Sequence, residues 1–171
     1  FSFFVISAAP REVIQAALDG IVAPDHIFGT ELEFAAGAGE VQSFVRVPAG
    51  YGKVAVLEEL EDRLAIAPDR TIYVGDGNSD VHVMLHVNNR NGFTIAVSEN
   101  RLLSRIAQST VISDNAFSVL IPILERIVGW RSSEIREFFE SNALHLHEWE
   151  KARTDRVTII GASVTPSDAV A

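Results

Sequence analysis

The chain has 171 residues, of which 47% are hydrophobic and 22% are charged, and it carries a formal net charge of -9. The length and composition fit one globular domain with a full core. A surface of this sign repels nucleic acid and anionic lipid, so we expect neither a nucleic-acid partner nor a membrane partner. A small anionic substrate is still compatible, because helix N-termini, a lysine and a metal can override the overall field locally.

The chain contains no cysteine. Disulfide bonds and thiolate metal sites are therefore excluded, and a reducing compartment fits best, so we expect a cytoplasmic protein. No apolar run approaches the roughly 20 residues that a membrane helix needs. The apolar start at residues 1–6 is too short for a secretory signal and has no basic flank. Because the chain begins with Phe1, we expect a fragment, a processed chain or part of a longer protein.

Apolar runs and helical spacing predict the elements of the first half in chain order. The unbroken apolar run at residues 3–6 is typical of a strand buried in a parallel sheet. A helix is expected over 11–18, with Pro10 in its first turn and Gly20 after its end. Two extended segments follow over 25–34 and 41–47, and Gly50 and Gly52 open a further helix.

The second half alternates strands with helices. Strands are expected over 71–74, 93–97 and 110–112, and helices over 80–87, 100–107 and 116–128. Such alternation predicts an α/β fold with an open, mostly parallel sheet and helices on both faces. We expect a core over 1–128, a helical appendage over 129–155 that packs on it, and a tail over 156–171 that frays.

Two carboxylates follow the predicted strand over 71–74. Asp76 and Asp80 lie just past its carboxyl end, where open α/β sheets place their ligands, and Gly75 and Gly77 let the backbone turn sharply between them. Hard oxygen ligands of this kind suit Mg²⁺. An acidic turn that caps the next helix is the alternative, and local spacing does not choose between the two.

A calcium loop fits only the first part of the same segment. Val81 stands where that loop needs glycine, and Val87 stands where it needs a bidentate glutamate, so we reject this interpretation.

Two further features carry chemistry suited to phosphate. Ser7 and Ala8 end the first predicted strand, where a hydroxyl and the backbone N–H groups of the following turn can hold a phosphate. Lys53 lies at the start of a predicted helix, within the segment 50–53. Each feature is weak alone, because most such serines are caps and most lysines are solvated.

Together, in this order, the segments 4–10, 50–53 and 74–80 resemble the second, third and fourth motifs of the haloacid dehalogenase superfamily, especially its phosphoserine-phosphatase-like branch. The resemblance covers about residues 3–128. It implies a Mg²⁺-dependent phosphatase that acts through an aspartyl-phosphate on a small phosphorylated metabolite. By the resemblance, Ser7 would bind the phosphoryl group and Lys53 would neutralise it, Asp76 would bind Mg²⁺ directly, and Asp80 would bind Mg²⁺ or orient a water in its shell.

One part of the family pattern has no match in this sequence. The family's nucleophile belongs to a first motif, Asp-x-Asp-x-Thr, on a strand between those that end at Ser7 and Val74. We expect another segment to complete the sheet there: an upstream N-terminal segment, a partner chain as in a homodimer, or residues 156–162. Direct pairing of the two strands would contradict this expectation.

Two other functions compete with a phosphatase. A catalytically inactive relative would bind a phosphorylated ligand or a partner without hydrolysis. A dinucleotide-binding domain would use the segment 50–55 as its glycine fingerprint, but Pro48 interrupts the preceding strand and Ser7 and Asp80 are left unexplained. The substrate itself is not readable from the sequence.

Overall fold

The computed structural model describes residues 1–37, 39–97, 99–113, 115–142 and 144. Its strands form two three-stranded sheets, with the orders β1-β2-β3 and β4-β5-β6. β1 and β2 are parallel, β2 and β3 are antiparallel, and β4, β5 and β6 are parallel. The strand bounds are β1 Val5–Pro10, β2 Ile27–Phe34, β3 Val41–Arg46, β4 Ile72–Gly75, β5 Phe93–Ala96 and β6 Ser109–Thr110. The predicted α/β class with parallel pairing is confirmed.

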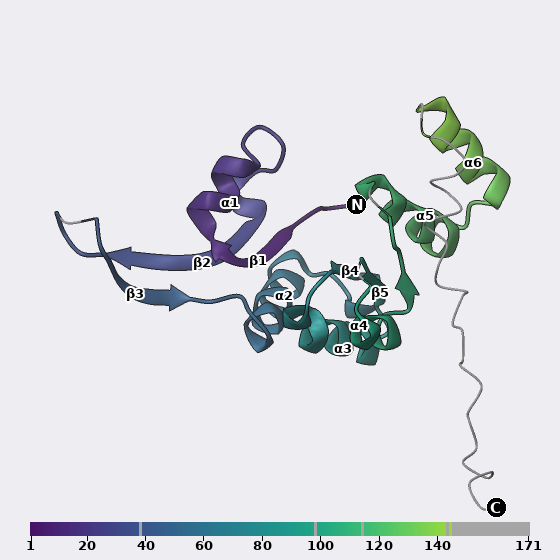
Figure 1. The fold of residues 1–171 in the computed structure, drawn as a ribbon. Coiled ribbons are helices and arrows are strands. Elements are labelled where there is room, and N and C mark those ends of the chain that lie inside the picture. Colours follow the sequence, from purple (N-terminus) through teal and green to yellow (C-terminus); the bar gives the residue numbers. More distant parts are fainter. Residues whose placement is uncertain (38, 98, 114, 143, 145–171) are drawn as a thin grey trace, which may run out of the picture.

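Helices connect successive strands, except that β3 follows β2 directly as a hairpin (Figure 1). The α-helices are α1 Arg11–Ala17, α2 Tyr51–Leu64, α3 Val81–Asn89, α4 Arg101–Ile106, α5 Leu120–Ile123 and α6 Ser132–Ser141. Short 3-10 turns cover Pro24–His26, Pro68–Arg70, Asn78–Asp80 and Ala116–Val119, and a π-helix covers Leu124–Val128. No helix among these is long and apolar enough to cross a membrane.

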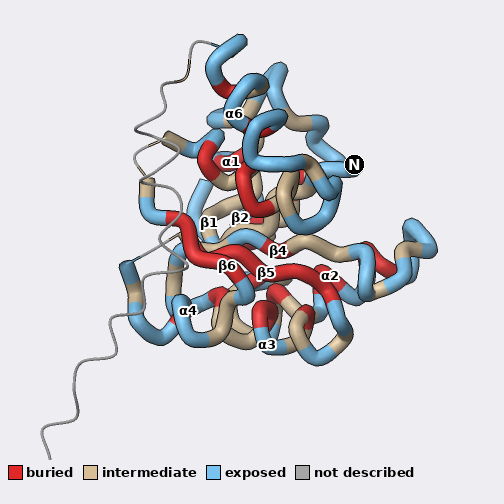
Figure 2. The backbone as a smooth tube through the Cα atoms, turned by 90° about the vertical axis from the view of Figure 1, so that its right-hand side faces the viewer, coloured by how far each residue is buried: buried red, intermediate tan, exposed pale blue. Residues whose placement is uncertain are grey.

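Helices cover both faces of the β4-β5-β6 sheet. Strand residues alternate between the two faces, so each face presents its own apolar side chains to the helices that cover it. Toward α2, α3 and α4, Tyr73 and Ala96 pack in one apolar cluster with helix residues such as Leu57 and Leu103. On the other face the strand residues pack against α5 and α6 in a second cluster, which contains Phe93, Ile95, Val111, Ile121, Ile135 and Phe139. Figure 2 shows this buried sheet between α6 and the pair α3 and α4.

The structure differs from the predicted elements at two prolines. Pro10 is the last residue of β1 rather than part of the first helical turn, because its ψ of 134° keeps it extended and α1 begins at Arg11. The single helix expected over 116–128 is divided into a 3-10 turn, α5 and a π-helix. Pro122 lies inside α5 and has no N–H to donate, so regular α-helical hydrogen bonding is interrupted there.

β1 and β4 do not pair with each other within the described residues, and each is the first strand of its own sheet. Their burial reflects this. Every residue of β5, which has a neighbour on each side, is buried, whereas no residue of β1 is buried and Val74 of β4 is 41% exposed. Strands of a parallel sheet are normally buried on both faces. We call the unpaired edges of β1 and β4 the open edges.

Candidate active site

Asp80 lies at the centre of a buried polar cluster at the carboxyl end of β4. Its side chain is only 2% exposed. Oδ1 accepts hydrogen bonds from Lys53 Nζ at 2.5 Å and from the Tyr73 hydroxyl at 2.7 Å. Oδ2 accepts from the backbone N–H groups of Asp76 at 3.1 Å and Gly77 at 3.0 Å. A carboxylate offers about four lone-pair positions, so these donors occupy its full accepting capacity.

Three elements supply the cluster. Lys53 lies in the first turn of α2, Tyr73 is in the middle of β4, and Asp80 ends the 3-10 turn that leads into α3. α2 and α3 pack against each other, which brings the lysine to the aspartate across 27 positions of sequence. Lys53 is 7% exposed, so it is a buried ammonium paired with a buried carboxylate and not a solvated surface lysine.

Gly75 makes the close approach of Asp80 to the strand end possible. A Cβ atom added at Gly75 would lie 2.6 Å from Cγ of Asp80, well inside van der Waals contact. A Cβ atom at Gly77 would instead lie 3.9 Å from its nearest neighbour, which is ordinary contact. The first glycine of the segment 75–77 is therefore required by packing against the carboxylate.

The electrostatics of the cluster favour an ionised Asp80. Burial raises the pKa of the Asp80 carboxyl, but hydrogen bonds from Lys53, Tyr73 and Gly77, with the Lys53 charge, outweigh it, so this pKa lies below its ordinary value. Burial, the hydrogen bond to Asp80 and the negative charges of Asp80 and Asp76 raise the pKa of the Tyr73 hydroxyl far above its ordinary value. Tyr73 therefore stays protonated and remains a donor.

Asp76 differs from Asp80 in its environment. It is exposed, and no hydrogen bond to its carboxylate is found within the described part of the chain. Among the same residues no group of three or more histidines, aspartates and glutamates gathers to hold a metal ion. Mg²⁺ nevertheless needs only one or two carboxylates, with water and a phosphate oxygen completing its shell. Asp76 fits that requirement, whereas direct ligation by Asp80 would displace one of its four donors.

Ser7 and Ala8 are the third and fourth of the six residues of β1, so the strand runs on to Pro10 and does not end at Ser7 and Ala8 as predicted. β1 contacts α2, the helix that carries Lys53. Ser7 Oγ accepts a hydrogen bond from the N–H of Ala9 at 3.2 Å. The carbonyl of Ala8 accepts from Thr30 Oγ1 at 2.6 Å, which ties this strand end to β2. Within the described residues, no hydrogen bond joins Ser7 to Lys53, Asp76 or Asp80.

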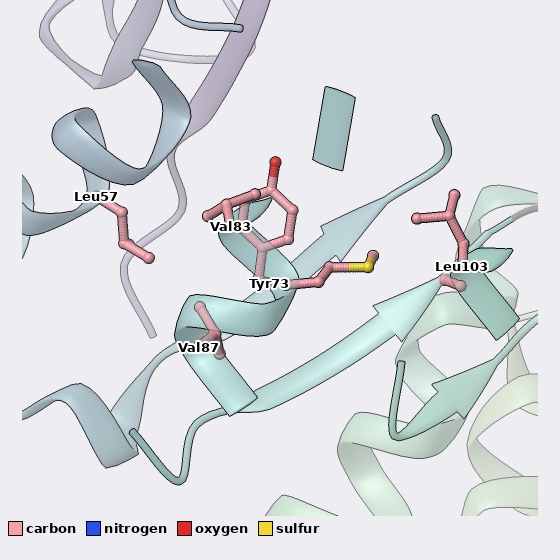
Figure 3. Packing of buried hydrophobic residues seen from close by; sticks show 7 residues of the cluster. Leu57, Tyr73, Val83, Val87 and Leu103 are labelled. Carbon is pink, nitrogen blue, oxygen red and sulfur yellow. The ribbon is translucent and has the colours of Figure 1, made fainter. Parts of the chain in front are cut away.

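The structure joins the two predicted residues Asp76 and Asp80 by a hydrogen bond from the Asp76 N–H. Tyr73 was not identified from the sequence as a site residue, only as a strand residue. The sequence did contain an indication, because Tyr73 lies in a strand predicted to be buried and a buried tyrosine hydroxyl usually needs a hydrogen-bond partner. Figure 3 shows the Tyr73 ring among apolar neighbours with its oxygen pointing away from Val87. Of the two histidines of α3, His82 stacks on Tyr51 with ring centroids 4.1 Å apart, and His86 Nε2 lies 3.0 Å from Arg90 Nη1.

The chain was compared with protein-family models and with curated proteins. No curated protein matches the chain. Residues 1–85 match the family model of haloacid dehalogenase-like hydrolases, a span that contains Ser7, Lys53, Asp76 and Asp80. Over residues 1–85 the chain is therefore similar to haloacid dehalogenase-like hydrolases, and its α/β fold with parallel strands agrees with that similarity.

Proposed function

We propose that this chain is the greater part of the catalytic domain of a Mg²⁺-dependent phosphomonoester hydrolase. The observation that carries the proposal is the cluster at the carboxyl end of β4, where the buried Lys53–Asp80 pair lies beside the exposed carboxylate of Asp76. The match to haloacid dehalogenase-like hydrolases supports the reaction class. The phosphoserine-phosphatase-like branch and a small phosphorylated metabolite as substrate belong to the same proposal.

Each residue has a stated role in the proposal. Asp76 holds Mg²⁺, which supplies charge neutralisation at the phosphoryl oxygens when it is bound. Lys53 has one N–H on Asp80 and two further N–H groups to donate to phosphoryl oxygens. The Ser7 hydroxyl and the backbone at Ala8 bind the same phosphoryl group from β1. Asp80 fixes Lys53 and the turn at 76–77 by its four hydrogen bonds.

The nucleophile is proposed to come from a strand that lies between the open edges of β1 and β4. Two observations support this position: the two strands belong to separate sheets, and both are less buried than β5. A parallel strand there would end beside Asp76 and Lys53, and an aspartate at its end could attack phosphorus to form an aspartyl-phosphate. An upstream segment or a partner chain would supply it.

Phosphate binding tests the proposal on the chain itself. Isothermal titration should show that inorganic phosphate binds more tightly with Mg²⁺ present than with a chelator. Ser7→Ala should weaken phosphate binding by roughly 10- to 150-fold, because a hydrogen bond to a charged group contributes about 1.5–3 kcal/mol. Ser2→Ala, at an exposed serine before the amino end of β1, should leave phosphate affinity unchanged. Equal phosphate affinity with Mg²⁺ and with chelator would contradict the proposal.

A further inference from the structure

Tyr73 joins the apolar core to the polar cluster. Tyr73 is 8% exposed and belongs to the apolar cluster with Leu57, Val83 and Leu103 on the face of the sheet that α2 and α3 cover. Its hydroxyl donates to Oδ1 of Asp80 at 2.7 Å. A tyrosine has two side-chain torsions, so a packed ring gives the hydroxyl a fixed position.

Lys53 is held in a different way. Its ammonium ends a flexible four-carbon chain and donates to the same Oδ1 atom at 2.5 Å. Since Tyr73 takes one lone-pair direction of Oδ1, the ammonium is confined to the other. The backbone N–H groups of Asp76 and Gly77 fix Oδ2, so the carboxylate is held at both oxygens.

We propose that Tyr73 is a positioning residue: its hydroxyl shares Oδ1 of Asp80 with Lys53 and thereby sets the direction in which the ammonium meets a phosphoryl oxygen. No substrate contact is assigned to Tyr73, which acts through Asp80 and Lys53.

The matched variants are Tyr73→Phe and Tyr51→Phe, which remove one hydroxyl each from the two tyrosines of the chain. Tyr51 is 74% exposed and lies two positions from Lys53, so it controls for an altered ring near α2. In ¹H–¹⁵N spectra, the Lys53 ammonium should give a slowly exchanging signal in the wild type. Tyr73→Phe should broaden or shift that signal, and Tyr51→Phe should not. This readout does not depend on the proposed function.

Phosphate affinity with Mg²⁺ provides a second readout, and this one rests on the proposed function. Tyr73→Phe should weaken phosphate binding by about 3- to 10-fold, as expected for one hydrogen bond. In a Lys53→Met background the same change should have no further effect, because Tyr73 acts through Lys53. If the wild type binds no phosphate, the proposed function fails while the ammonium signal still decides the role of Tyr73.

Labelling with 3-fluorotyrosine tests whether Tyr73 and Lys53 share Oδ1 of Asp80 without removing the Tyr73 hydroxyl. The ¹⁹F signal of Tyr73 is the one that remains in Tyr51→Phe. Between the wild type and Lys53→Met, the Tyr73 signal should shift, and the Tyr51 signal should shift less. Three results would each overturn the inference: an unchanged Tyr73 signal in Lys53→Met, an unchanged Lys53 ammonium in Tyr73→Phe, or additive effects of the two variants on phosphate affinity.

Discussion

Asp76→Asn should remove Mg²⁺-dependent phosphate release from a protein in which the strand with the nucleophile is also present. Asparagine keeps the size of the side chain but loses the negative charge that a hard cation requires. A bound metal contributes several kcal/mol to charge neutralisation in the transition state, so the rate should fall on the order of 100-fold or more. Hydrolysis of a generic phosphomonoester, with and without chelator, measures the change.

The control for Asp76→Asn is Asp69→Asn. Asp69 is also exposed, and it lies before the amino end of β4 rather than after its carboxyl end. It should retain wild-type turnover, because nothing in the proposal places a phosphoryl group at that end of the sheet. Unchanged activity in Asp76→Asn would contradict the proposal that Asp76 binds the metal.

Asp80→Ala should lower the free energy of unfolding by about 3–5 kcal/mol, the usual range when one partner of a buried ion pair is removed. The loss is expected to be large because the Lys53 ammonium would remain buried without its partner, and Tyr73 would lose its acceptor. Urea unfolding followed by circular dichroism measures the difference.

A double variant separates the buried charge from other causes. Adding Lys53→Met to Asp80→Ala should restore part of the lost stability, because no charge is then left buried without a partner. Asp69→Ala should change stability by less than about 0.5 kcal/mol, as surface substitutions usually do. A loss of that small size in Asp80→Ala would show that the Lys53–Asp80 pair does not hold the fold together.

Much of the fold was predictable because apolar runs and helical spacing report burial directly. The strands at 72–75 and 93–96 and the helices around them lie within a few residues of the predicted ranges. The exceptions depend on local backbone detail. Pro10 suits both the end of a strand and the start of a helix, and only its torsion angles decide. The tail predicted over 156–171 lies outside the described residues.

The candidate site was predictable in part. The spacing of Asp76 and Asp80 around two glycines indicated that both follow one strand, and the structure joins them by a hydrogen bond from the Asp76 N–H. The contact between Lys53 and Asp80 depends on how α2 packs against α3, which spacing does not specify. Saturation of Asp80 by four donors is a tertiary property as well, so its role at the metal could not be chosen from sequence.

We propose that one edge of the molecule holds a metal-bound phosphoryl group. Mn²⁺ in place of Mg²⁺, with phosphate, tests it through paramagnetic broadening of backbone amide signals. We predict broadening at residues 7–9, around Lys53 and at 75–80, with the turn Pro68–Arg70 unaffected. Broadening that spares either Ser7 or Lys53, or that centres on Pro68–Arg70, would contradict the account.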